Sequence, residues 1–182
     1  MQVTIMQVTR AREVTVPKPQ ELGGESRLYL EDLLVGRRFT SATHVIDAAQ
    51  IKAFAGQFDP QPFHLDDEKA KGTLFAGLAA SGWHTAAITM RLLVESGLPL
   101  AGGIIGAGGE VSWPRPTRPG DVLRVVSEIE QVTPSRSRAD RGTVRVRSET
   151  RNQRDEVVQV LIANLIVPRR ATSQVPGELA AG

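Results

Sequence analysis

The chain has 182 residues, a formal net charge of +2 at pH 7, and no cysteine. Its length suits one domain with tails, and its 41% content of hydrophobic residues is enough for a packed core. The lack of cysteine excludes disulfides, thiol nucleophiles and cysteine-ligated metals, and it fits a reducing compartment. Because the arginines are scattered rather than gathered into a basic run, nucleic-acid binding is not favoured.

No stretch of about 18 apolar residues occurs, so we expect no membrane span. The N-terminus also lacks the apolar core of a signal peptide, which favours a cytoplasmic protein. The composition predicts a polar N-terminal tail over residues 1–27, one domain over residues 28–168, and a small, polar C-terminal tail over residues 169–182.

The first elements of the domain are predicted to be a strand over residues 38–46 and a helix that follows it. Asp47 has the properties of an N-cap, and Gln50 stands three residues later to complete a capping arrangement. The helix should end at Asp59, because the residue before a proline is pushed out of the helical region.

A second, more apolar helix is predicted over residues 83–95. Before it, Asp66 should cap a short helical turn that ends at Gly72. Ser81 is a good N-cap for the apolar helix, and Gly82 would leave its backbone N–H approachable. Because this helix is apolar on most sides, we expect a sheet to bury it.

The rest of the domain alternates in the manner of strands. The expected strands cover residues 104–113, 122–132, 142–150 and 156–167. The last is nearly all apolar, which predicts a central strand. The glycines of residues 102–109 do not match G-x-G-x-x-G and indicate a strand that another chain or helix approaches closely. Segregated helices and consecutive antiparallel strands indicate an α+β fold.

The stretch from Asp59 to Gly82 contains the parts of an acid–base site. Asp59 and His64 are five residues apart, and two prolines between them stiffen the link. Gly82 lies at the start of the apolar helix, where free N–H groups and the positive end of the helix dipole face outward. A carboxylate, an imidazole and such a helix start suit general acid–base chemistry on a carbonyl compound whose oxygen becomes negative.

Three segments of the chain resemble the MaoC-like dehydratases, which include the (R)-specific enoyl-CoA hydratases. Residues 59–64 (Asp-Pro-Gln-Pro-Phe-His) resemble their Asp-x-Asn-Pro-x-His motif. Residues 75–82 resemble their Phe-x-x-x-Ile-Ala-His-Gly turn, and residues 115–121 resemble their Pro-x-x-x-Gly-Asp connection. The resemblance covers residues 28–168 in register.

This resemblance implies a hot-dog fold, in which a curved antiparallel sheet of about five strands wraps around the apolar helix. It implies a homodimer whose two sheets join, an acyl-CoA thioester as substrate, and a lyase activity that adds water to trans-2-enoyl-CoA. By position, Asp59 and His64 would activate the water and the Gly82 N–H would bind the thioester oxygen. No metal or redox cofactor is implied, and CoA enters only as part of the substrate.

The chain departs from the family pattern at two positions: Gln61 replaces the asparagine, and Ser81 replaces the histidine before the glycine. With His84, one turn into the helix, we take these as candidate substrate-binding residues. Two alternatives stay open. The first is a hot-dog thioesterase, which would need a carboxylate on or near the central helix, where the helix offers only Glu95 at its far end. The second is a non-catalytic acyl-CoA-binding subunit, which would be consistent with Gln61 and Ser81 in place of the family's asparagine and histidine.

Overall fold

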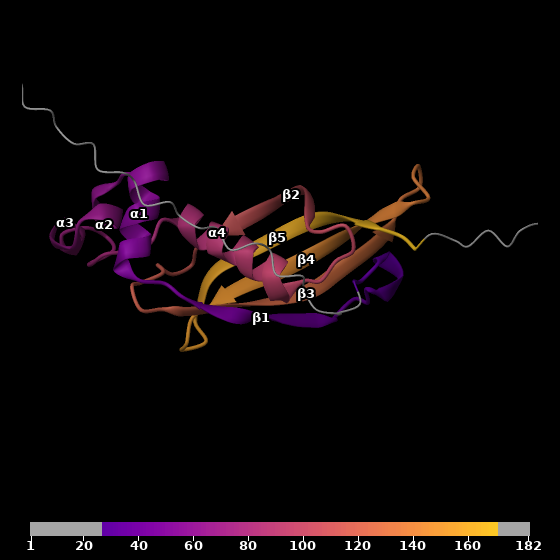
Figure 1. Cartoon of the computed structure of the whole chain (residues 1–182), viewed down its shortest axis with the longest axis horizontal. Coiled ribbons are helices and arrows are strands. Elements are labelled where there is room, and N and C mark those ends of the chain that lie inside the picture. The colour runs from indigo at the N-terminus through magenta and orange to yellow at the C-terminus, as the bar shows by residue number, and fades with distance from the viewer. Residues whose placement is uncertain (1–26, 171–182) are drawn as a thin grey trace, which may run out of the picture.

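The computed structural model describes residues 27–170 (Figure 1). The expected tails therefore lie almost entirely outside the described residues. Two residues assigned to the C-terminal tail are described and are tied to the domain: Arg169 pairs with Glu31 at 2.8 Å, and Arg170 pairs with Asp32 at 2.7 Å. The domain thus extends at least to Arg170.

A five-stranded antiparallel sheet, in the order β1-β3-β4-β5-β2, forms one layer of the structure. Its strands are β1 (Arg38–Val45), β2 (Ile105–Ser112), β3 (Val122–Pro134), β4 (Arg141–Arg151) and β5 (Val157–Pro168). The expected strands are all present. β5 was expected to be central and is an interior strand, but β4 occupies the middle of the sheet.

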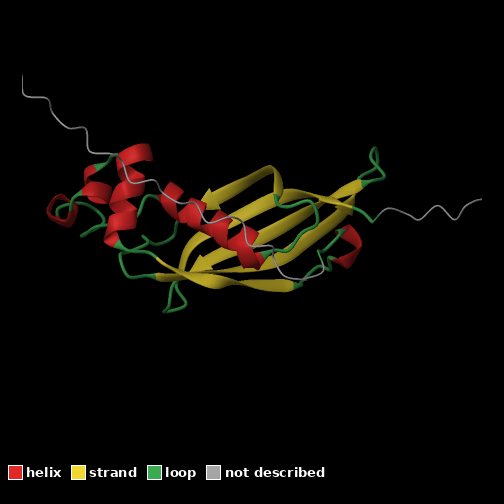
Figure 2. Ribbon diagram, in the orientation of Figure 1, coloured by secondary structure: helices red, strands yellow, loops and turns green. Residues whose placement is uncertain are grey.

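The helices form the second layer, and Figure 1 shows α4 (Gly82–Leu92) lying across one face of the sheet. It continues directly into the π-helical segment η2 (Leu93–Gly97). Figure 2 shows the other α-helices gathered beyond one end of the sheet. They are α1 (Ala48–Phe58), α2 (Pro62–Leu65) and α3 (Asp67–Lys71), while a short 3-10 turn, η1 (Leu30–Asp32), precedes β1. This arrangement confirms the expected α+β hot-dog architecture.

The helix boundaries follow from local chemistry. The Asp47 carboxylate accepts a hydrogen bond from the Gln50 N–H at 2.8 Å and caps α1. Asp66 accepts from the N–H groups of Glu68 and Lys69 and caps α3. The segment between Asp59 and Asp66 was expected to be a stiff loop, but it contains the single turn α2. Pro62 stands at the start of that turn, where its fixed φ suits a helix.

The sheet buries only one face of α4. Thr85, Ile88, Thr89 and Leu92 face inward, whereas Trp83 and Met90 are exposed by 62% and 43%. The expectation that a sheet buries this helix therefore holds for one face, because a single sheet covers one side of a helix.

The glycine-rich strand β2 lies at an edge of the sheet and pairs only with β5 in the described part of the chain. A Cβ atom on Gly109 would stand 2.5 Å from the carbonyl oxygen of Ile162 on β5. At Gly109 the backbone that approaches closely is therefore that of the neighbouring strand β5. Between residues 27 and 170, no helix is long and apolar enough to cross a membrane.

Candidate active site

The acid and the imidazole are brought together by the chain reversal between α1 and α2. Asp59 ends α1 with φ −154°, and its N–H still donates to the Ala55 carbonyl at 2.9 Å. His64 lies on α2. The Asp59 Oδ2 atom is 3.4 Å from His64 Nε2, and the two side chains are only 19% and 5% exposed. The two side chains therefore lie close together and largely out of bulk water.

The hydrogen bond on the other side of the ring fixes the tautomer of His64. Its Nδ1 atom lies 2.7 Å from the carbonyl oxygen of Ala79. A carbonyl can only accept, so Nδ1 carries a proton and donates it. In the neutral ring Nε2 then holds the lone pair, on the side where Asp59 lies. Nε2 is therefore the ring atom available to take a proton from a bound water.

The loop that carries Ala79 is held by Arg118. The guanidinium donates from Nη1 to the carbonyl oxygens of Gly77 at 2.8 Å and Leu78 at 3.1 Å, and from Nη2 to the Phe75 carbonyl oxygen. The Ala79 N–H also donates to the Phe63 carbonyl at 3.2 Å, next to His64 in sequence. Arg118 and these backbone bonds place the acceptor that orients the imidazole.

Two of the residues predicted to bind substrate, Gln61 and Ser81, also act on Asp59. The Gln61 Nε2 atom donates to Asp59 Oδ1 at 2.7 Å. Burial raises the pKa of Asp59, but hydrogen bonds from the Ser81 hydroxyl and the Gln61 amide, together with the charge of His64, outweigh it. The net effect lowers the pKa of this carboxyl below its usual value, so it is ionised at neutral pH.

The start of α4 lies at the same place. The Ser81 Oγ atom accepts from the Trp83 N–H at 3.2 Å and caps the helix. Gly82 is the first helical residue, so its N–H has no carbonyl one turn earlier to bind. A Cβ atom on Gly82 would stand 2.7 Å from Cε2 of Trp113, whose indole packs against this backbone. Only glycine fits here without a shift of the ring.

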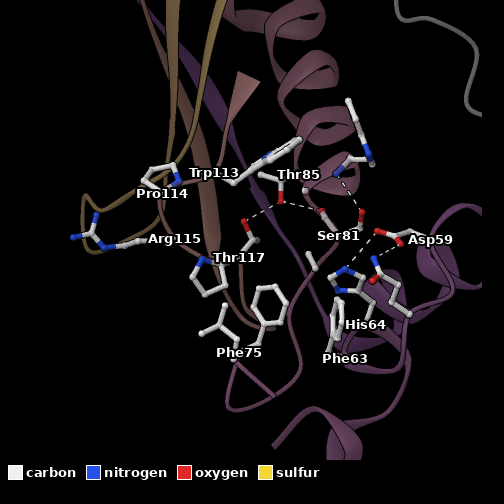
Figure 3. A pocket seen from close by; sticks show the side chains of 16 residues that line it. Asp59, Phe63, His64, Phe75, Ser81, Thr85, Trp113, Pro114, Arg115 and Thr117 are labelled. Carbon is white, nitrogen blue, oxygen red and sulfur yellow. Dashed lines mark hydrogen bonds and ion pairs between the residues drawn. The ribbon is translucent and has the colours of Figure 1, made fainter. Parts of the chain in front are cut away.

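Asp59, His64 and the start of α4 line one pocket of about 500 Å³ (Figure 3). Its walls come from four segments of the chain, and the lining residues are Asp59, Gln61, Phe63, His64, Leu74, Phe75, 80–83, Thr85 and 113–117. Of the predicted site residues, Asp59, Gln61, His64, Ser81 and Gly82 line it.

His84 is not among the residues lining this pocket. Its ring stacks on Phe54 with the ring centroids 4.5 Å apart and the planes 2° from parallel. Burial, and secondarily the charge of His44, lower the pKa of His84. Its buried Nδ1 atom has no hydrogen-bond partner in the described part of the chain.

Sequence reasoning missed the pocket wall formed by residues 113–117 and the anchoring role of Arg118. Residues 115–121 matched the family's Pro-x-x-x-Gly-Asp connection, but that match did not indicate which residues the segment contacts. No three acidic or histidine side chains gather in the 27–170 segment in a way that would hold a metal ion.

A family model described as "MaoC like domain" matches residues 34–152 of the chain. The chain belongs to the MaoC-like family. The resemblance inferred from residues 59–64, 75–82 and 115–121 is thereby confirmed. The match runs from just before β1 to the turn after β4 and includes every residue lining the pocket of this MaoC-like domain.

Of three similar proteins, two are named as dehydratases and one is named as uncharacterized. The crystal structure of the MaoC-like dehydratase from Rhodospirillum rubrum is 66% identical, with a TM-score of 0.79, and the match covers 80% of this chain and 99% of that one. The uncharacterized protein YdeM of Bacillus subtilis is 34% identical over 129 residues, which are 69% of this chain and 89% of YdeM. The 3-hydroxybutyryl-CoA dehydratase of Methylorubrum extorquens is 31% identical over 118 residues, 62% of this chain and 70% of that protein.

Proposed function

We propose that this MaoC-like domain is a hydro-lyase of the enoyl-CoA hydratase type. It would add water reversibly to a trans-2-enoyl-CoA thioester and give a 3-hydroxyacyl-CoA. The observation that carries the proposal is the pairing of Asp59 and His64 Nε2 at 3.4 Å in the same pocket as the start of α4 at Gly82. The relative named 3-hydroxybutyryl-CoA dehydratase supports a reaction of this class, written in the reverse direction.

In the proposed reaction a water molecule is held between the Asp59 carboxylate and His64 Nε2. Nε2 takes a proton from the water while the water oxygen forms a bond to C3 of the substrate. The C2=C3 electron pair moves toward the thioester, and negative charge grows on its oxygen. The Gly82 N–H at the positive end of α4 stabilises that oxygen. The proton on Nε2 then passes to C2, which completes the product and restores the neutral ring.

The two departures from the family motif are compatible with this chemistry. Gln61 still reaches Asp59 through its amide, and Ser81 still caps α4. The hydroxyl of Ser81 also helps to keep Asp59 ionised. Both residues therefore support the carboxylate that the proposed reaction needs.

The thioesterase alternative finds no support on α4. Glu95, the carboxylate considered for that role, lies in η2 and forms an exposed ion pair with Arg91 at 2.8 Å. It is not among the residues lining the pocket. A carboxylate held there would not attack or activate water at a thioester bound near Gly82.

The test is hydration of crotonyl-CoA, followed by loss of the conjugated-thioester absorbance. Asp59→Asn and His64→Ala should each lower kcat by about 10²-fold or more, because each removes a group that holds or deprotonates the attacking water. Asp140→Asn and His44→Ala are matched controls, since Asp140 is exposed, His44 is half-buried, and neither side chain lines the pocket. Rates in the two site variants equal to those of the controls would contradict the proposal. Release of free CoA thiol without hydration would favour a thioesterase.

We also propose that the chain forms a homodimer through β2. In the described part of the chain this strand is an edge strand, and its Ile105 side chain is exposed. Joining two β2 edges would pair their backbone groups and cover the edge. Sedimentation should give the mass of two chains, and Ile105→Lys should shift the equilibrium toward single chains. A single-chain mass for the wild type at micromolar concentration would refute the dimer.

A further inference from the structure

The indole of Trp113 is fixed from two directions. Its Nε1 atom donates to Gln159 Oε1 on β5 at 2.8 Å. One side of the ring lies so close to Gly82 that a Cβ there would stand 2.7 Å from Cε2 and 2.8 Å from Cδ2. Figure 3 shows the indole beside the first turn of α4, above the pocket that His64 and Asp59 line. The ring is therefore held in one orientation at the pocket wall.

Gln159 in turn is held by a buried polar network with no titratable member. Its side chain is fully buried, and its Nε2 atom donates to Thr89 Oγ1 at 2.9 Å. Thr89 Oγ1 uses its single proton on the Thr85 carbonyl at 2.8 Å, so Thr150 must donate to Thr89 across their 2.6 Å contact. Because an indole N–H can only donate, Oε1 faces Trp113 and the amide of Gln159 has one allowed orientation.

This network occupies the space between α4 and the sheet behind Trp113. Thr89 and Thr150 are as fully buried as Gln159. Nearer the pocket, Thr85 donates to Thr117 Oγ1 at 3.0 Å, and both are 2% exposed. A long acyl chain running along α4 would have to displace the indole and leave the buried amide of Gln159 without its partner, which is unfavourable.

We infer that Trp113 limits the length of the acyl group and that Gln159 is the positioning residue that holds it there. The site then takes short enoyl thioesters such as crotonyl-CoA and rejects longer ones such as trans-2-octenoyl-CoA. The inference rests on the proposed function, because it assumes that an enoyl thioester occupies this pocket.

The test compares kcat/KM for crotonyl-CoA and trans-2-octenoyl-CoA in the wild type, Trp113→Ala, Trp113→Phe and Gln159→Leu. The wild type should prefer crotonyl-CoA. Trp113→Ala should raise the octenoyl-to-crotonyl ratio at least about tenfold, which is the scale of a single methylene in an apolar pocket. Gln159→Leu should shift the ratio in the same direction by a smaller factor, because the ring stays but its anchor is lost. Gln131→Leu is the matched control, since the Gln131 side chain is exposed on β3 and donates to the Thr133 hydroxyl.

If Trp113 and Gln159 only stabilised the fold, their substitution would lower kcat/KM for crotonyl-CoA and trans-2-octenoyl-CoA in proportion and leave the ratio of the two unchanged. If Trp113→Ala does not fold, Trp113→Phe decides, because it keeps an aromatic ring while losing Nε1–H and part of the volume. An unchanged ratio in every folded Trp113 variant overturns the inference, while hydration of crotonyl-CoA by the wild type leaves the proposed function standing.

If the wild type hydrates neither thioester, the proposed function fails and the length limit is tested by binding alone. Calorimetry with butyryl-CoA and octanoyl-CoA then replaces turnover. Octanoyl-CoA binding that strengthens relative to butyryl-CoA in Trp113→Ala supports the limit. Equal relative binding in the wild type and the variant overturns it.

Discussion

Replacing Gly82 by alanine is the sharpest test of how the helix start and the pocket wall fit together. The added Cβ would stand 2.7 Å from Cε2, 2.8 Å from Cδ2 and 3.0 Å from Cζ2 of Trp113. Ordinary contacts begin at 3.4 Å, so the nearest one falls short by 3.4 − 2.7 = 0.7 Å. The neighbour is a rigid ring anchored by Gln159, so it has little freedom to yield.

Overpacking of this kind costs about 1–3 kcal/mol of unfolding free energy. For a domain of this size, that corresponds to a fall in Tm of roughly 2–10 °C. Because a displacement approaching 1 Å can cost about 10²-fold in rate, we expect Gly82→Ala to lower kcat on crotonyl-CoA by about 10- to 100-fold. Chemical denaturation and steady-state kinetics measure the two effects.

The double variant Gly82→Ala/Trp113→Leu tests whether the cost of Gly82→Ala comes from its clash with the Trp113 indole. Leucine has no ring, so the penalty for Gly82→Ala should largely vanish in this background, and the coupling between the two sites should be about 1–3 kcal/mol. Gly56→Ala is the control: Gly56 lies inside α1 with open space around it, so alanine should stabilise the protein by about 0.5–1 kcal/mol. A penalty at Gly82 that is the same with and without the indole would refute the reasoning.

Three further predictions concern charge and the loop beside His64. The pKa of Asp59 is lowered in the folded state, so the ionised carboxylate should stabilise the fold above about pH 4 and lose this effect as the pH falls further. The difference in unfolding free energy between the wild type and Asp59→Asn should therefore shrink as the pH falls below about 4. Burial lowers the pKa of His84, so the histidine of the unfolded chain takes up a proton at a higher pH than that of the folded chain, and the unfolding free energy should fall as the pH drops through about 6.5. His84→Phe can still stack on Phe54, and urea denaturation of this variant should show no such fall in unfolding free energy. Arg118→Met should speed amide hydrogen exchange in residues 75–80, because the loop that carries Ala79 loses its support. The variant should also lower kcat more than it raises KM, because the Ala79 carbonyl no longer holds the His64 ring in place. Unchanged exchange in residues 75–80 would contradict the anchoring role of Arg118.

Local chemistry made most of the fold predictable. Asp47, Asp66 and Ser81 cap helices where their side chains and spacing indicated, and the later strands follow the alternation of the sequence. The single turn α2 was missed, because Pro62 signals both a stiff loop and the first residue of a helix, and only tertiary contacts decide between them.

The site was predictable where its parts are close in sequence and not where they are distant. Asp59 and His64 are five residues apart, so a short reversal must bring them near each other. Trp113 and Gln159 are separated by 46 positions, and their contact depends on the pairing of β2 with β5. Such a contact leaves no periodic signal. His84 shows the opposite case: its sequence proximity to Gly82 suggested the pocket, but the helical turn directs it toward Phe54.

The order of strands in the sheet has a consequence for how the molecule folds. β3, β4 and β5 are joined by short connections and pair with their neighbours along the chain, so they need only short loops to close. β1 and β2 flank the helical segment in the sequence but occupy opposite edges of the sheet, so that segment must span from one edge to the other. The Asp59–His64 pair belongs to it, whereas Trp113 and Thr117 lie in the β2–β3 connection. We therefore expect enzyme activity to return later in refolding than the circular-dichroism signal of the sheet, because the pocket closes only when both edge strands have docked.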